Sequence, residues 1–322
     1  MPADLGAADG FTHHACLYGS DDEFLAMAVP FAERGLAAGE PVLAATTAAN
    51  IASLRAALGG RAYALDTAET AFFGRRPVER VSAFLRYHAR RAVPGRRMRM
   101  IAEPVWGGKS AHQVAEWQRM EAGLNVLLAE LPVWMICPYD TRAVPERVSA
   151  AARATHPGLM DGARLLPCPD YAAPGEYAAA VAPDLPSPPA GAPGVGPTAD
   201  APAVRRFARE RAAAAGLSGS RLALAELAVH EAAGYLLATP GARVSARMWT
   251  EPGALACELL RHAPGSAPPP VFAGFHPPGA APDAADGLWL ARSLSEYMEV
   301  RGDGPWTRIT LHIAGPRDAE RL

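Results

Sequence analysis

The residues most able to do chemistry in this chain lie where apolar stretches of its first half end. Glu103 follows the run MRMIA, and Tyr139 closes the run VWMICPY. Ligands in sheets of parallel strands sit at the carboxyl ends of those strands, so we expect these segments to converge there. Aromatic rings beside a few carboxylates suit a small, partly apolar ligand. The candidate pocket residues are Glu103, Trp106, Trp117, Glu121, Cys137, Tyr139 and Asp140, with His14 as a further ligand or proton switch.

A second interpretation of the same residues stays open. Trp106, Trp117 and Tyr139 also suit core aromatics whose polar tips are satisfied by hydrogen bonds. Cys137 suits a buried, inert thiol, because a redox sensor would need an accessible sulfur with a lowered pKa. A lone histidine such as His14 is more often structural than functional.

Several common site types are missing from the sequence. There is no GxSxG nucleophile elbow, no GxxxxGK[ST] loop and no GxGxxG after a predicted strand. His13 and His14 stand near a cysteine but lack a spaced partner pair for a metal. The four cysteines form no CxxC pair, so no metal site is expected; they are Cys16, Cys137, Cys168 and Cys257.

Composition limits the class of protein. The chain has 322 residues, half of them hydrophobic, which is enough for two ordinary domains with buried cores. Its net charge of -2 gives no general attraction to nucleic acid or acidic lipid, so neither partner is expected. No N-terminal apolar run suits a signal peptide, and no stretch approaches the roughly 20 apolar residues of a membrane span. We expect a cytoplasmic protein with reduced thiols.

A segment rich in Pro, Ala and Gly interrupts the chain between residues 172 and 201. Proline fixes φ and removes a backbone donor, so this composition favours a semi-extended linker over a regular element. The predicted organisation is a first domain at 1–172, a linker at 173–200 and a second domain at 201–322.

Helical and strand-like stretches alternate through residues 1–172. This alternation predicts an α/β fold with a mostly parallel sheet covered by helices. Pro30 should kink or split the first helix. The expected helices are 21–39, 48–58, 77–91, 111–131 and 145–154, and the expected strands are 41–47, 61–67, 98–106 and 133–139.

The second domain has a different order of elements. Two helices come first, then two strands, a loop rich in Pro and Gly, a helix and a last strand. Helices on one face of a mixed sheet would make an α/β sandwich. The expected helices are 203–215, 220–237 and 288–297, and the expected strands are 243–250, 254–261 and 306–313.

Residues 11–171 resemble the MEDS family of sensory domains. The resemblance lies in five short stretches that occur in the family's order, which together are fairly specific. It implies a sensory domain, which could bind a small ligand, and no defined reaction. The stretches are HHACLY (13–18), AEPVWGG (102–108), EWQRMEAGLNVLL (116–128), ICPYDT (136–141) and HP (156–157).

Residues 201–322 resemble the ATP-binding domain of anti-sigma serine kinases, which have the Bergerat (GHKL) fold. The resemblance lies in LALAELAVHEAAGYLL (222–237), in DGLWLARSL (286–294) and in the strands around them. The family's first motif reads roughly ELxxN, in which the Asn holds the Mg²⁺ bound to ATP. Here Glu226, the family's presumptive general base, is present, but His230 stands at the Asn position.

The other nucleotide-binding positions depart from the family as well. Arg261 stands where an Asp should accept a hydrogen bond from the adenine amino group, and arginine is only a donor. The lid retains only Gly279 and Gly287 of a glycine-rich loop. The resemblance therefore implies an ATP-incompetent pseudokinase, with Glu226, His230, Arg261 and Gly287 as remnants of the nucleotide site and no catalytic residue.

A MEDS domain joined to a GHKL domain is similar to the RsbA-type anti-sigma regulators. That resemblance implies a stress-response regulator whose second domain binds a sigma factor or an anti-sigma antagonist, without cofactor. One alternative is an active serine/threonine kinase that uses ATP and Mg²⁺ and phosphorylates an anti-sigma antagonist, with Glu226 as its base. Another is that the second domain only dimerises or stabilises the sensor.

Overall fold

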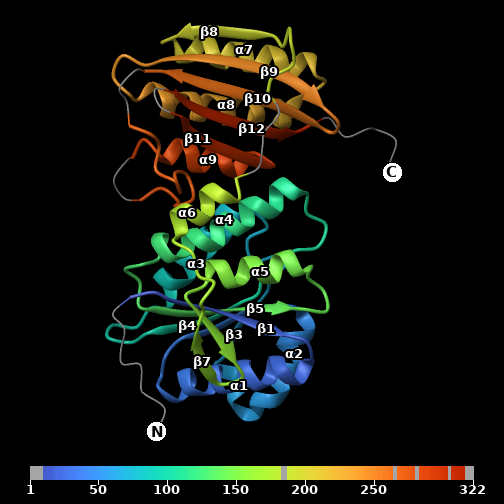
Figure 1. Ribbon diagram of the computed structural model, residues 1–322, viewed down its shortest axis with the longest axis vertical. Helices are drawn as coiled ribbons and strands as arrows, with labels where there is room; N and C mark the ends of the chain where they lie inside the picture. The colour runs from blue at the N-terminus through green and yellow to red at the C-terminus, as the bar shows by residue number, and fades with distance from the viewer. Residues whose placement is uncertain (1–9, 183–186, 264–266, 280–282, 304–305, 316–322) are drawn as a thin grey trace. The chain divides into compact units, whose positions relative to one another are not determined.

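The computed structural model describes residues 10–182, 187–263, 267–279, 283–303 and 306–315. The chain divides into two compact units, residues 1–181 and 182–322, and each is described by itself (Figure 1). The division therefore falls inside the segment 173–200 that was expected to be a linker.

The first unit is built on sheet A, whose seven strands run in the order β3-β2-β4-β5-β1-β6-β7. All neighbouring pairs are parallel except the β6–β7 hairpin, so the expected mostly parallel sheet is confirmed. Two inner strands, β2 and β4, are buried along their whole length, as strands covered on both faces should be. The strands are β1 (Thr12–Tyr18), β2 (Val42–Thr46), β3 (Asp66–Glu69), β4 (Met98–Ala102), β5 (Val133–Asp140), β6 (Gly158–Asp161) and β7 (Arg164–Pro167).

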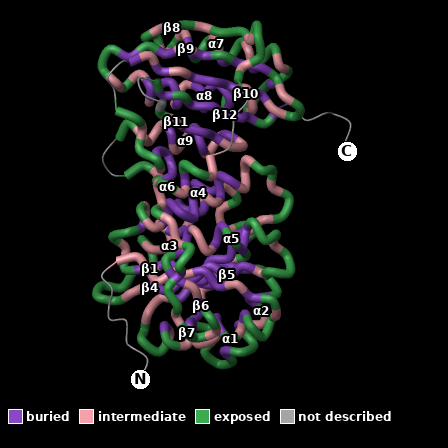
Figure 2. The backbone as a smooth tube through the Cα atoms, in the orientation of Figure 1, coloured by how far each residue is buried: buried purple, intermediate pink, exposed green. Residues whose placement is uncertain are grey.

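Helices cover both faces of sheet A. One face packs on α1 and α2, whose apolar residues form a core with Cys16, Tyr18 and Ile136. The other helices lie on the opposite face (Figure 1), and the residues between the layers are buried (Figure 2). The helices are α1 (Asp21–Ala37), α2 (Ala48–Leu58), α3 (Pro77–Arg91), α4 (Ala111–Leu127), α5 (Glu146–Thr155) and α6 (Pro174–Ala180), with a 3-10 turn at Gly59–Ala64.

Local sequence signals account for most helix limits. Ser20 caps α1 by accepting a hydrogen bond from the backbone of Glu23, and Ser110 with Gln113 forms a capping box on α4. The expectation that Pro30 could split the first helix was wrong. α1 is continuous because Met27 and Phe31, on either side of the proline, are buried in the core.

Residues 61–67 were expected to be a strand, but only their end is one. Gly59–Ala64 forms the 3-10 turn and β3 begins at Asp66. Strands β1, β6, β7, β8 and β11 were not anticipated as elements. They are short or carry polar residues at buried positions, so an apolar pattern alone does not indicate them.

Residues 173–200 contain regular structure, contrary to the linker expectation. α6 packs against α4 and α5, and β8 (Gly194–Thr198) pairs antiparallel with β9. Pro174 lies in the first turn of α6, where an amide hydrogen is not needed. Pro197 lies in an edge strand, which tolerates a missing donor. The prolines therefore occupy positions that regular structure accepts.

The second unit is built on sheet B, with strand order β11-β12-β10-β9-β8. Every pair in it is antiparallel, so the expected mixed sheet was wrong. Apolar residues of α7, α8 and α9 share one core with alternate residues of β9, β10 and β12. The elements are α7 (Ala201–Ala214), α8 (Gly219–Leu237), β9 (Arg243–Glu251), β10 (Ala254–His262), α9 (Asp286–Leu294), β11 (Tyr297–Asp303) and β12 (Trp306–Ala314).

No helix in the described part of the chain combines the length and apolar character that crossing a bilayer would require.

Candidate functional site

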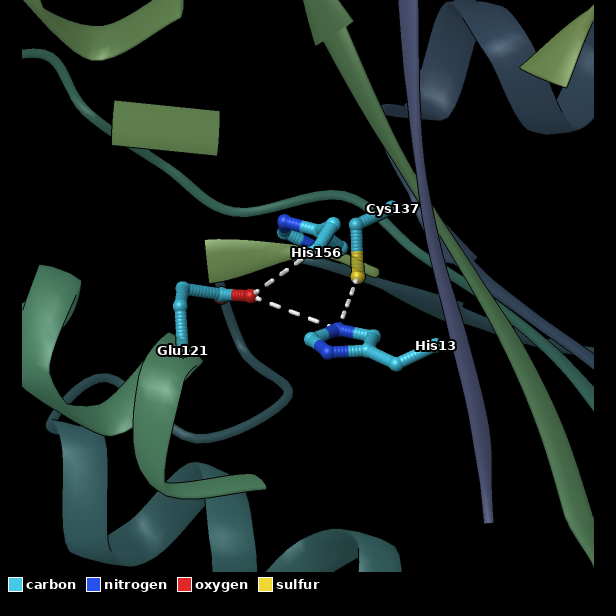
Figure 3. A group of neighbouring side chains, drawn as sticks. All are labelled: His13, Glu121, Cys137 and His156. Atoms are coloured by element: carbon cyan, nitrogen blue, oxygen red, sulfur yellow. Dashed lines mark hydrogen bonds and ion pairs between the residues drawn. The ribbon is translucent and has the colours of Figure 1, made fainter. Parts of the chain in front are cut away.

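Four buried side chains with metal-ligating atoms meet on the side of sheet A opposite α1 and α2 (Figure 3). They are His13 from β1, Glu121 from α4, Cys137 from β5 and His156 from the end of α5, and we call them the tetrad. One ligand atom from each lies within 4.8 Å of the others. His13 Nε2 is 3.3 Å from Cys137 Sγ, and Glu121 Oε2 is 3.7 Å from Nε2 of each histidine.

The protonation of His13 follows from its neighbour Asn125. The amide nitrogen of Asn125 donates to the carbonyls of Ala122 and Thr155, so its oxygen is left to accept. That oxygen lies 3.3 Å from His13 Nδ1. His13 therefore carries its proton on Nδ1, and Nε2 presents a lone pair to the tetrad.

His156 is held in the same tautomer. Its Nδ1 is 2.7 Å from the carbonyl oxygen of Ala152, which only accepts, so Nδ1 must donate. Nε2 then carries a lone pair, and within the described residues this buried atom has no hydrogen-bond partner. Glu121 Oε2 is buried without a hydrogen-bond partner in the same way. His156 Nε2 and Glu121 Oε2 therefore face one another 3.7 Å apart with no hydrogen bond between them.

Burial controls the charges of the tetrad. It lowers the pKa of His156 to about 3 and that of His13 well below its usual value, so both imidazoles are neutral. Burial also raises the pKa of Glu121 to about 7, against the opposing effects of the Arg80 charge and a hydrogen bond with Cys137. The pKa of the Cys137 thiol is raised for the same reason, burial first and the neighbouring Glu121 second.

The predicted aromatic residues lie beside the tetrad. Trp106 stacks on Tyr139 with ring centres 6.1 Å apart and meets Trp117 edge-on at 6.4 Å. Tyr139 in turn meets the ring of His156 edge-on at 5.9 Å. Of the candidate residues, the fold thus brings together Trp106, Trp117 and Tyr139, with Glu121 and Cys137 among their neighbours in the tetrad.

Arg80 borders this aromatic group. Its guanidinium lies 5.5 Å from the centre of the Trp117 ring, and Nη2 donates to the carbonyl of Glu103 at 3.0 Å. Its Nη1 and the indole nitrogen of Trp106 are buried without a hydrogen-bond partner among the described residues. Two donors therefore lack an acceptor in this region.

The Glu103 carboxylate belongs to a separate, satisfied network. Tyr18 donates to it at 2.9 Å and Asn50 at 3.0 Å, and Thr46 also donates to it. The carboxylate is buried but fully occupied by protein donors, which makes it a structural anchor for the ends of β1, β2 and β4.

His14 and Asp140 do not join the other candidates. Successive residues of a strand point to opposite faces, so His14 lies across sheet A from His13 and accepts a hydrogen bond from Trp134 at 2.9 Å. Burial and the nearby Arg97 lower the pKa of His14 to about 4. Asp140 lies near the surface, where Arg142 holds its carboxylate and lowers its pKa.

On that opposite face the structure has a cavity of about 440 Å³, a size that suits a small ligand. It lies between α1, β1 and the β6–β7 hairpin. Its lining includes Tyr18, Glu23, Met27 and Met160, none of which the sequence indicated as a site.

His13, Asn125 and His156 were missed by reasoning from spacing. His13 lies 112 residues from Asn125 and 124 residues from Cys137 in the sequence, so no local sequence pattern connects these residues. The signal that could have found them was the set of family motifs, since His13 opens HHACLY and His156 opens HP. Choosing His13 over His14 also required the register of β1 against β5, which pairs Ala15 with Cys137.

Cys137 contacts His13, which in turn contacts Asn125, and this chain of contacts is the one expected of a thiol nucleophile, its general base and an orienting amide. A nucleophile, however, needs an accessible sulfur and a lowered pKa. Cys137 is 1% exposed and burial raises its pKa, so the arrangement does not favour covalent catalysis. It offers instead two imidazole nitrogens, a sulfur and a carboxylate oxygen, which is a donor set for a metal ion.

In the second unit, Glu226 and Arg261 of the predicted nucleotide-site remnants have protein partners, whereas the buried Nδ1 of His230 has no hydrogen-bond partner among the described residues. Glu226 accepts from Arg205 at 2.6 Å and from Arg209 at 2.9 Å, and these arginines lower its pKa. Arg261 is buried and donates to the Thr239 hydroxyl at 2.9 Å and to the carbonyl of Ala267 at 3.0 Å. A side chain at Gly287 would meet Glu231 of α8 at about 3.0 Å.

Comparison with known proteins finds a family match within the first unit. Residues 12–157 match the family MEDS, described as the MEthanogen/methylotroph, DcmR Sensory domain. All four residues of the tetrad lie within the matched range. No curated protein matches the chain. The matched segment is similar to a family of sensory domains, which suggests a role in signalling.

Proposed function

We propose that this chain is a signalling regulator whose MEDS sensory domain controls a degenerate GHKL domain of anti-sigma serine-kinase type. On this proposal the second domain acts by binding a protein partner, a sigma factor or an anti-sigma antagonist, and does not turn over ATP. The element order of residues 201–314 supports it in part, because two helices, a hairpin, a loop, a helix and a last strand follow one another as expected, with β11 as an additional strand before the last one.

The observation that carries the pseudokinase proposal is Arg261. It lies on β10, in the layer between sheet B and the helices, where the resemblance puts the acceptor for the adenine amino group. A buried guanidinium offers only donors, and an unmade hydrogen bond in a binding site costs about 1–3 kcal/mol. Arg261 donates hydrogen bonds to Thr239 and Ala267, so moving its side chain out of this position would break both bonds.

Glu226 supports the same proposal. A general base needs a free lone pair and a pKa near the working pH. Both carboxylate oxygens of Glu226 accept from arginines of α7, and its pKa is lowered, so it is a poor base. The lid between 263 and 285 lies partly outside the described residues, at 264–266 and 280–282.

For the sensory domain we propose a small ligand that is partly apolar and carries a hydrogen-bond acceptor. Trp106 stacks on Tyr139 and meets Trp117 edge-on, and these three rings supply apolar surface. The unpartnered donors, Arg80 Nη1 and Trp106 Nε1, supply the polar contacts that such a ligand would satisfy.

The test is calorimetric titration of the full chain with ATP and Mg²⁺, beside the double variant His230→Asn, Arg261→Asp. We expect no binding heat from the wild type at millimolar nucleotide and a gain of binding in the double variant. Micromolar, Mg²⁺-dependent binding by the wild type would contradict the proposal.

A second candidate function is the active serine kinase, which the retained Glu226 and Gly287 favour. It would use ATP and Mg²⁺ and phosphorylate an anti-sigma antagonist. The same titration separates the two candidates, because only the active kinase needs the wild type to bind nucleotide.

A further inference from the structure

The spacing of the tetrad approaches the edges of a tetrahedron around a metal ion. Zn²⁺ lies about 2.0 Å from nitrogen or oxygen and about 2.3 Å from sulfur, so the ligand atoms of a tetrahedral site with one sulfur are roughly 3.3–3.5 Å apart. Three contacts within the tetrad measure 3.3, 3.7 and 3.7 Å. The longer separations, which reach at most 4.8 Å, would have to shorten by up to about 1.3 Å to close the tetrahedron.

Hydrogen bonds around the tetrad also orient its histidines so that their Nε2 lone pairs are available to a cation. Both histidines are fixed with Nδ1 as donor, to Asn125 in one case and to the Ala152 carbonyl in the other. This is the outer-shell arrangement by which proteins orient metal-binding imidazoles. His156 Nε2 and Glu121 Oε2 are buried and make no hydrogen bond among the described residues, and a cation between them would satisfy both.

Charge balance favours a divalent ion. One Zn²⁺ with one thiolate and one carboxylate is neutral, which avoids the cost of a net charge in a buried site. Binding would release the Cys137 proton, and the Glu121 proton wherever that carboxyl is still protonated. The neutral histidines would release none. Arg80 is the cation that acts on Glu121 and Cys137, and other titratable neighbours are Cys16, Tyr139 and His14.

We propose that His13, Glu121, Cys137 and His156 form a closed zinc-type site inside the sensory domain. Two nitrogens, a sulfur and an oxygen in tetrahedral arrangement favour Zn²⁺ over Mg²⁺ or Ca²⁺, which prefer more numerous oxygen ligands. The expectation of no metal rested on the absence of ligand spacing in the sequence, whereas the fold supplies the four ligands from distant elements.

Such an ion would tie together β1, β5, α4 and the end of α5. α6 packs against α4 and α5, so occupancy would affect the helical layer that precedes the second unit in the sequence. The site does not depend on the proposed kinase-like domain, and its test can succeed or fail independently of ATP binding.

The experiment uses the full chain, stripped of metal with a chelator and titrated with Zn²⁺ and then with Co²⁺ as a spectroscopic probe. We expect one ion per chain, an intense visible spectrum of tetrahedral Co²⁺ and a thiolate-to-Co²⁺ charge-transfer band. The triple variant Cys16→Ser, Cys168→Ser, Cys257→Ser keeps Cys137 as its only thiol and should retain that band.

Ligand variants are compared with matched controls. Cys137→Ser should abolish the charge-transfer band and weaken Zn²⁺ binding by more than about 100-fold, beyond the effect of an outer-shell change. Cys16→Ser, a buried thiol of the adjacent strand on the other face, should do neither. His13→Gln should weaken binding similarly, and its neighbour His14→Gln should not.

Two results would overturn the proposal. One is a folded wild-type chain that takes up no Zn²⁺ in competition with a weak chelator. The other is Co²⁺ binding whose spectrum is unchanged by Cys137→Ser, which would mean that the ion binds elsewhere. If Cys137→Ser fails to fold, the shape-conserving Glu121→Gln variant and the triple-cysteine variant decide the question in its place.

Discussion

Replacing Glu121 by Gln should remove a pH dependence that burial imposes on the metal-free protein. The side chain keeps its shape but no longer ionises. Glu121 is 4% exposed, and its pKa rises from 4.5 in an open environment to about 7 in the fold. The folded state therefore holds the proton more tightly than the unfolded state between these two values.

The sign of the effect follows from this difference. A folded pKa above the unfolded one stabilises the protein fully below about pH 4.5, and this contribution is lost as the pH rises through 7. Between about pH 5 and about pH 8 the wild type should lose about 2–3 kcal/mol of unfolding free energy relative to Glu121→Gln, because each tenfold change in proton affinity corresponds to roughly 1.4 kcal/mol.

The assay is denaturant unfolding of both proteins across this pH range, with a chelator present. The other titrating groups, including His13, His14 and His156, occur in both proteins, so they cancel in the difference. Parallel stability curves would refute the reasoning, since they would mean that Glu121 ionises equally easily in both states. Adding Zn²⁺ to the wild type should abolish or reverse the difference at high pH if the tetrad binds it.

Three further predictions concern individual contacts. Glu103→Ala should destabilise the first unit by about 3–5 kcal/mol in thermal or denaturant unfolding, because Tyr18, Thr46 and Asn50 lose their shared acceptor. The control is Asp140→Ala, at a partly exposed strand end, which should cost at most about 1 kcal/mol of unfolding free energy. Equal losses of stability in the two variants would contradict the burial argument. Asn125→Ala should weaken Zn²⁺ binding by about 10–100-fold while leaving one ion per chain, because Asn125 positions His13 without touching the ion. An unchanged Zn²⁺ affinity would show that Asn125 does not position a metal ligand. Arg205→Ala and Arg209→Ala should each lower the free energy of unfolding by at most about 1 kcal/mol, since the two side chains are 54% and 60% exposed. The double variant should lose more than the sum of the two single losses, because it removes both arginines that hold Glu226. Strict additivity in a double-mutant cycle would argue against that shared role.

The sequence by itself determined most of the helices and the inner strands. Capping residues and apolar periodicity are local signals, and they placed α2 at 48–58 and α3 at 77–91 as the structure has them. The family motifs likewise predicted the resemblance to MEDS, and residues 12–157 match that family. Residue types alone also raised the question of ATP binding, because an arginine cannot accept a hydrogen bond from adenine whatever its surroundings.

The tertiary structure decided which candidates meet. His13 and His14 are adjacent in sequence, yet the two-residue period of β1 sends them to opposite faces of the sheet, and only the pairing with β5 shows which one meets Cys137. Glu103 and Glu121 are both buried carboxylates, but one has three protein donors and the other has an oxygen with none. Such differences depend on partners far away in sequence, so register and packing between elements decide them and local patterns do not.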